Sequence, residues 1–90
     1  MESFEKALEY NEKAISLREL YLDPLHPNLA QTYHNASFVY YHLGLLQKAQ
    51  DAIDKAFFIR KTILKENHPY FLNTKKRRSQ IIAVRKEKNQ

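Results

Sequence analysis

Residues 22–37, LDPLHPNLAQTYHNAS, and residues 64–79, LKENHPYFLNTKKRRS, are two copies of one pattern set 42 residues apart. The same shift aligns most of the chain, with identities spaced regularly over one and a half periods. Self-similarity of this kind predicts a repeat architecture. The ten identical pairs are Lys6/Lys48, Ala7/Ala49, Lys13/Lys55, Ala14/Ala56, Arg18/Arg60, Leu22/Leu64, His26/His68, Pro27/Pro69, Thr32/Thr74 and Ser37/Ser79.

Each copy of the pattern predicts two helices. Residues 3–22 lack proline and glycine, and their apolar residues recur at spacings of three and four, as on one face of a helix. Asp23-Pro24 ends this helix because the residue before a proline is pushed out of the α region. Pro27 opens the next helix without losing a needed N–H donor. By the same signs, further helices are expected at about residues 27–43, about residues 46–65 and from Tyr70 onward, with a turn at Gly44.

The fold class that follows is all-α, a solenoid of about four helices in antiparallel pairs. Short connections force consecutive helices to run antiparallel, and a repeated helix pair cannot bury its apolar face alone. Ala7, Ala14, Ala49 and Ala56 fall in register, and their lack of bulk lets neighbouring helices approach closely. Ninety residues make one small domain, so the buried core is modest.

At these residues the chain resembles tetratricopeptide repeats, in the 42-residue variety of kinesin light chains. The resemblance implies one domain over residues 1–90: the second helix of a partial repeat at 1–25, a full helix pair at 26–66 and a capping helix at 67–90. The residues that carry the resemblance are His26-Pro27, Thr32 and Asn35 in a Thr-x-x-Asn segment, Tyr40, Gly44, Leu46 and Ala49 in an apolar-x-x-Ala segment, and Ala56.

The resemblance also implies a function, which is to hold another protein. The first helix of each pair would line a concave groove that binds a peptide or a partner helix. In related domains an asparagine at the place of Asn35 holds the ligand backbone, and Lys76 with Arg77 would favour an acidic ligand. The alternative is that Asn35 bonds a neighbouring helix and the charges face water. The groove residues implied are Gln31, His34, Asn35, Phe38, Tyr41, His42, Asn73, Lys76, Arg77 and Gln80.

Two departures from the repeat pattern lie inside the predicted helices, and each carries its own expectation. Asn11 stands where the other copy has Ile53, which weakens the core of the first helix. Lys75 and Arg78 replace the counterparts of Tyr33 and Ala36, which suits a polar terminal cap. The last residues, after Val84, are expected to fray. Tyr33 and Tyr40, seven residues apart, are expected in the core, and Phe38 and Tyr41 on another face.

The chain opens in the middle of a repeat, so the face around Phe4, Ala7, Asn11 and Ala14 lacks a packing partner. This face is expected to pair with a second copy, giving a homo-oligomer, or to belong to a longer protein. A purely structural self-association element therefore remains an alternative function.

Charge is distributed unevenly, with three basic and six acidic groups in residues 1–45 and twelve basic and four acidic groups in residues 46–90. The run Lys75 to Arg78 offers a competing function, a basic accessory domain that binds nucleic acid or phosphate. Against that function, the sequence shows no nucleic-acid module and the run falls inside a repeat helix. A protein ligand is therefore preferred to nucleic acid.

Several other classes are disfavoured by what the sequence lacks. It has no cysteine, no His-Glu-x-x-His or comparable ligand spacing, and no glycine-rich phosphate loop or nucleophile elbow. We therefore expect no metal, no cofactor and no enzymatic activity. No window is apolar enough for a membrane span, and we expect a cytoplasmic protein. His26 and His68 are expected to share one structural role in the turns.

Overall fold

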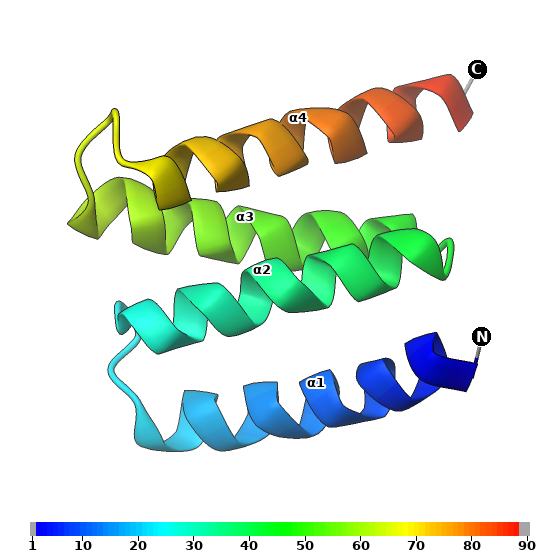
Figure 1. The fold of residues 1–90 in the computed structure, drawn as a ribbon, viewed down its shortest axis with the longest axis horizontal. Coiled ribbons are helices and arrows are strands. Elements are labelled where there is room, and N and C mark those ends of the chain that lie inside the picture. The colour runs from blue at the N-terminus through cyan, green and yellow to red at the C-terminus, as the bar shows by residue number, and fades with distance from the viewer. Residues whose placement is uncertain (1, 89–90) are drawn as a thin grey trace.

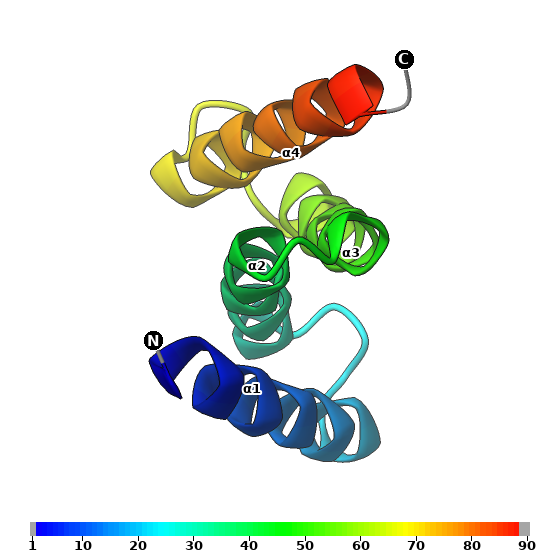
Figure 2. The same ribbon diagram turned by 90° about the vertical axis from the view of Figure 1, so that its right-hand side faces the viewer.

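The computed structural model describes residues 2–88 and contains four helices and no strand in that range. They are α1 (Glu2–Tyr21), α2 (Pro27–His42), α3 (Leu46–Ile63) and α4 (Pro69–Lys88). Consecutive helices lie side by side and run antiparallel (Figure 1). Seen end on, α2 and α3 are offset from each other, and α1 and α4 form the two ends of the stack (Figure 2). The predicted all-α class of packed helix pairs is confirmed.

The two His-Pro turns have the same construction. The Nδ1 atom of His26 accepts a hydrogen bond from the backbone N–H of Asn28 at 3.0 Å. The Nδ1 atom of His68 accepts one from the N–H of Tyr70, also at 3.0 Å. Each histidine therefore satisfies a donor that the first turn of the following helix leaves without an intrahelical partner. The prediction that one structural role explains both histidines is confirmed.

A side-chain contact between helices also repeats with the 42-residue period. Arg18 of α1 donates from Nη1 to the hydroxyl of Thr32 on α2 at 2.8 Å. Its counterpart Arg60 of α3 donates from Nη1 to the hydroxyl of Thr74 on α4 at 3.0 Å. The two halves of the chain thus share a helix-to-helix contact as well as a sequence pattern.

The core lies mainly between α2 and α3 and is built around small side chains. Ala30 and Ala36 of α2 and Ala49 and Ala56 of α3 are fully buried. Alanines at these places let the helix axes approach closely, and Ile53 fills the space at the centre of α3. The buried residues of the core cluster are Leu29, Ala30, Tyr33, Ala36, Tyr40, Ala49, Ala52, Ile53, Ala56, Ile59 and Ile81.

The turn between α2 and α3 is made by Gly44, as expected. Its φ of 78° lies in the left-handed region, which a residue with a side chain adopts only at a cost. Beyond it, the N–H of Leu45 reaches back to the carbonyl of Tyr40 at 2.9 Å. This arrangement satisfies a carbonyl at the end of α2 and turns the chain sharply into α3.

The chain departs from the sequence expectations at both ends. The prediction that the residues after Val84 fray is wrong for residues 85–88, because α4 continues to Lys88, and the last two positions, 89–90, lie outside the described residues. Arg85 tethers this end by donating to Gln50 Oε1 at 2.6 Å and to Gln47 Oε1 at 2.8 Å. In α1, the expectation that the face around Phe4 lacks a packing partner is wrong at Phe4 itself, because its ring lies against those of Phe38 and His42 on α2, at 6.3 and 5.2 Å between centroids. Asn11 donates to the carbonyl of Ala7 at 2.8 Å.

Candidate functional site

Two adjoining hollows run across α1, α2 and α4. The larger has a volume of about 640 Å³ and lies between α1 and α2, and the smaller, of about 350 Å³, lies on α2 and α4. They share His34 and Arg77. The larger is lined by Ser3, Phe4, Ala7, Tyr10, Asn11, His34, Asn35, Phe38, Val39 and Arg77. The smaller is lined by His34, Asn73, Lys76, Arg77 and Gln80.

Seven of the ten predicted groove residues meet in these two hollows. We call this set the basic strip, and its members are His34, Asn35, Phe38, Asn73, Lys76, Arg77 and Gln80. The other three predicted residues lie beside the strip. Gln31 is hydrogen-bonded to Asn35, Tyr41 is half-buried against the core, and His42 stacks on the ring of Phe4 with 5.2 Å between ring centroids.

His34 stands at the centre of the strip and is tied to a chain of polar side chains. The guanidinium of Arg60 donates to the Thr74 hydroxyl, and that oxygen lies 3.0 Å from His34 Nδ1. Which of the two groups donates in this contact is set by the tautomer of the imidazole.

The charged side chains that line the strip, Lys76 and Arg77, are both cations. Burial, together with the nearby charges of Arg60 and Arg77, lowers the pKa of His34 from 6.5 to about 4, so the ring is neutral at pH 7. The charges of Arg60 and Arg77, which contribute to this shift after burial, favour an anion beside the ring. No carboxylate is among the residues that line either hollow.

The two cationic side chains of the strip, Arg77 and Lys76, differ in how far their surroundings fix their positions. The guanidinium of Arg77 lies over the ring of Phe38, 4.9 Å from its centroid. This contact holds the charge beside an aromatic surface, an arrangement that stabilises both groups. Lys76 is exposed and keeps the freedom of a long side chain. The strip therefore offers one positioned cation and one mobile cation.

Asn35 is exposed, and half of its amide is already used. Its Oδ1 accepts a hydrogen bond from Gln31 Nε2 at 2.9 Å. Gln31 is fixed in turn because its Oε1 accepts from Arg60 Nη2 at 2.7 Å. This network orients the Asn35 amide from within its own helix and from α3. The hydrogen bond described for Asn35 joins it to its own helix, so it gives no support to the alternative that Asn35 bonds a neighbouring helix.

The basic run of residues 75–78 does not form one patch. Arg78 turns to α3, where its Nε donates to Asp54 Oδ1 at 2.7 Å and its guanidinium lies over the ring of Phe57. Arg77 faces the hollows instead, and Lys75 is exposed. Only part of the run is therefore available to one ligand.

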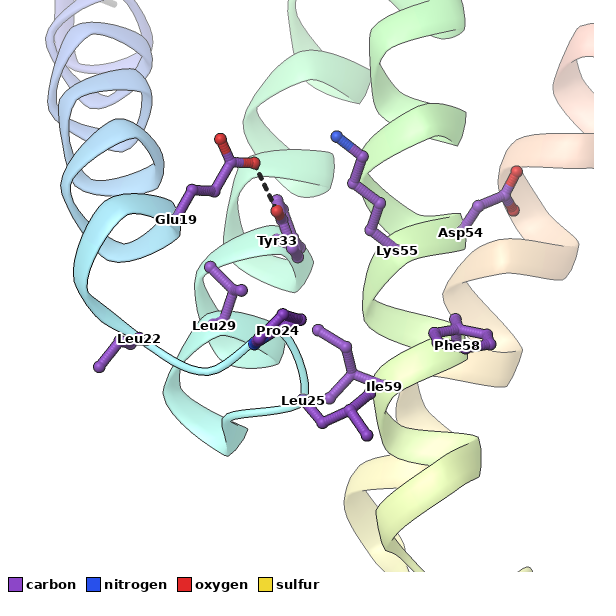
Figure 3. Close-up of a pocket in the computed structure, with 10 residues that line it drawn as sticks. All are labelled: Glu19, Leu22, Pro24, Leu25, Leu29, Tyr33, Asp54, Lys55, Phe58 and Ile59. Carbon is purple, nitrogen blue, oxygen red and sulfur yellow. Dashed lines mark hydrogen bonds between the residues drawn. The ribbon is translucent and has the colours of Figure 1, made fainter.

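A third hollow, which we call the apolar pocket, shares no residue with the basic strip, and the sequence did not predict it. It has a volume of about 490 Å³ and a mostly apolar lining (Figure 3). At its edge the Tyr33 hydroxyl donates to Glu19 Oε2 at 2.5 Å, and burial followed by this bond raises the pKa of Tyr33. The signal that could have indicated the pocket is Phe58, which is 63% exposed and stands where the other copy has Ser16. The lining residues are Glu19, Leu22, Pro24, Leu25, Leu29, Tyr33, Asp54, Lys55, Phe58 and Ile59.

Residues 2–88 hold no cluster of three or more histidine and acidic side chains that could bind a metal ion. In the same range no helix combines the length and the apolarity needed to cross a membrane.

Comparison with known proteins agrees with the fold of packed helix pairs. A family model described as tetratricopeptide repeat matches residues 1–69, and the chain belongs to that family. Proteins built on this repeat are generally non-catalytic and typically bind other proteins. No curated protein and no solved structure matches the chain. The matched segment covers α1 to α3 and ends where α4 begins.

Proposed function

We propose that the chain is a protein-interaction scaffold whose basic strip binds an acidic peptide or partner helix. One observation carries this proposal: the two adjoining hollows are lined by cations, amides and aromatic rings, and by no carboxylate. A groove of this composition suits an extended chain that carries acidic side chains, since guanidinium and ammonium groups pair with carboxylates.

Each strip residue has a role in this proposal. Asn35 holds the ligand backbone through the amide NH₂ group that its bond to Gln31 leaves available. Arg77 and Lys76 pair with acidic side chains of the ligand, and Phe38 supplies apolar contact. Aromatic and arginine side chains are the residues that most often dominate binding energy at interfaces.

The competing function, phosphate or nucleic-acid binding, is less well supported. That function needs several cations facing one surface. Arg78 contacts Asp54 and Phe57 on α3, so the cations of residues 75–78 on α4 do not all face one surface. We further propose that the repeat is of the 42-residue kinesin-light-chain variety, on the basis of its period and its His-Pro turns. A cytoplasmic location remains part of the proposal.

Replacing Asn35 and Lys76 together by alanine tests the proposed site. Peptides are first selected from a random library on the intact chain, and their affinity is then measured for both proteins. The double variant is expected to bind about ten-fold or more weakly, because it loses a backbone hydrogen bond and an ion pair. Binding should decline with salt less steeply than phosphate binding does.

The matched control replaces Lys65 and Asn67, which are exposed residues of the same two types in the loop before α4. This variant should bind the selected peptides like the intact chain. Equal losses in both variants, or no loss in the Asn35 and Lys76 variant, would count against the site.

A further inference from the structure

α1 carries an uncovered row of side chains that we call the α1 seam. Tyr10, Leu17 and Tyr21 are 67%, 59% and 77% exposed, and Ala7 and Ala14 complete the row at spacings of three and four residues. On α3 the repeat counterparts of the first four members are buried in the core against α2. These counterparts are Ala49, Ala52, Ala56 and Ile59. The α1 seam therefore has the pattern of a helix-packing face.

α4 carries the complementary row, which we call the α4 seam. It consists of Leu72, Lys75, Ser79, Ile82 and Lys86, and Leu72 is 46% exposed. On α2 the counterparts of its first four members are all buried, and most of them pack against α3. These counterparts are Ala30, Tyr33, Ser37 and Tyr40. Figure 2 shows α1 and α4 at the two ends of the stack, so the two seams cannot meet within one chain.

We propose that α4 of one copy packs on α1 of the next, reproducing between chains the α2–α3 pair found within the chain. The 42-residue shift relates α1 to α3 and α2 to α4, so the two seams correspond to the two sides of an existing interface. In that interface Tyr33 and Tyr40 lie beside Asp51, Ala52 and Lys55. The copied register places Lys75 and Ile82 of one chain beside Glu9, Tyr10 and Lys13 of the next.

Charge selects α4 of the second copy, and not its α1, as the occupant of the α1 seam. α1 has five acidic and three basic residues, whereas α4 has seven basic and one acidic residue. Opposite net charges attract two copies in the head-to-tail arrangement, and two α1 helices would repel each other. The copied register also brings Lys13 near Lys75, because Lys55 Nζ lies 5.3 Å from the Tyr33 ring in the α2–α3 pair, and Glu9 is the acidic residue placed beside these two cations.

The contact is heterologous, because the α4 seam of one copy meets a different surface, the α1 seam, on the next. Such contacts leave a free seam at each end and add copies until the assembly closes into a ring or continues as a filament. Ala7 and Tyr10 also border the larger hollow, so a docked copy and a ligand of the basic strip compete at that end of the strip.

Analytical ultracentrifugation of the 90-residue chain and three single variants tests the arrangement. Leu17→Glu blocks the α1 seam and Leu72→Glu blocks the α4 seam, whereas Leu20→Glu changes a leucine outside both that is still more exposed. The intact chain and Leu20→Glu should show a mass that rises above 10.7 kDa with concentration and reaches no plateau at a dimer. Each seam variant should associate at least about ten-fold more weakly with itself.

An equimolar mixture of the two seam variants gives the decisive result. Each contributes the seam that the other lacks, so the mixture should form a one-to-one dimer and stop there. Circular dichroism of every variant verifies that the helices are retained. A chain that stays monomeric at millimolar concentration overturns the proposal. So does a Leu72→Glu variant that still assembles like the intact chain, or a mixture that does not associate.

Discussion

Replacing Ile53 by alanine is expected to lower the free energy of unfolding by about 3 kcal/mol. Ile53 is fully buried, and it is among the largest side chains with no exposed surface. Alanine would leave a cavity in the middle of the helix stack, and the neighbouring alanines are too small to fill it. A domain of this size has a stability of only about 5–13 kcal/mol, so the loss should be evident in urea denaturation.

Ile63→Ala is the matched control for this experiment. It removes the same atoms at the end of the same helix, where the isoleucine is 38% exposed. Its cost should be below about 1 kcal/mol, because little apolar surface returns to water and no cavity forms. Equal costs at the two positions would show that the centre of α3 is not the centre of the core.

Replacing Arg60 by alanine is expected to cost about 2–3 kcal/mol. The side chain is only 5% exposed, and its guanidinium donates to Thr74 Oγ1, Gln31 Oε1 and the carbonyl of Tyr70. Burial lowers the pKa of Arg60. Alanine would leave the buried Thr74 hydroxyl without its arginine donor and would remove the hydrogen bonds that link α3 to Gln31 of α2 and to α4.

Arg18→Ala gives the comparison within the repeat. Arg18 makes the equivalent bond to Thr32, but it is only half-buried. Its removal should cost about 1 kcal/mol, the usual net value of one hydrogen bond. If urea denaturation gave Arg60→Ala the smaller loss, the proposed linking role of the arginine between three helices would be wrong.

Much of the fold was predictable from the sequence because its signals are local. The proline that follows each turn histidine marks where α2 and α4 begin, and Gly44 marks where α2 turns into α3. The repeat also predicted which helices are equivalent, since residues that lie 42 positions apart make equivalent contacts. Tyr33 and Tyr40 are buried, as their seven-residue spacing predicted.

The features that the sequence did not predict depend on contacts between distant residues. α4 continues to Lys88 because Arg85 reaches Gln47 and Gln50 on α3, and no local signal encodes that reach. The apolar pocket is assembled from the α1–α2 connection together with α2 and α3. Likewise, the chain of bonds from Arg60 through Thr74 to His34 joins three helices.

The candidate site was only partly predictable for a similar reason. The family resemblance indicated which face of α2 and α4 to consider, and seven of ten predicted residues lie together there. It could not indicate that Gln31 would be used to orient Asn35. Nor could it show that Tyr41 would be half-buried against the core.

The central claim is that the basic strip, and not another surface, receives a protein ligand. NMR titration of the labelled chain with a selected acidic peptide tests this claim most directly. The predicted result is that the amide signals that shift most belong to His34, Asn35, Phe38, Asn73 and Arg77. Shifts that gather instead around Leu25, Leu29 and Phe58, in the apolar pocket, would contradict it.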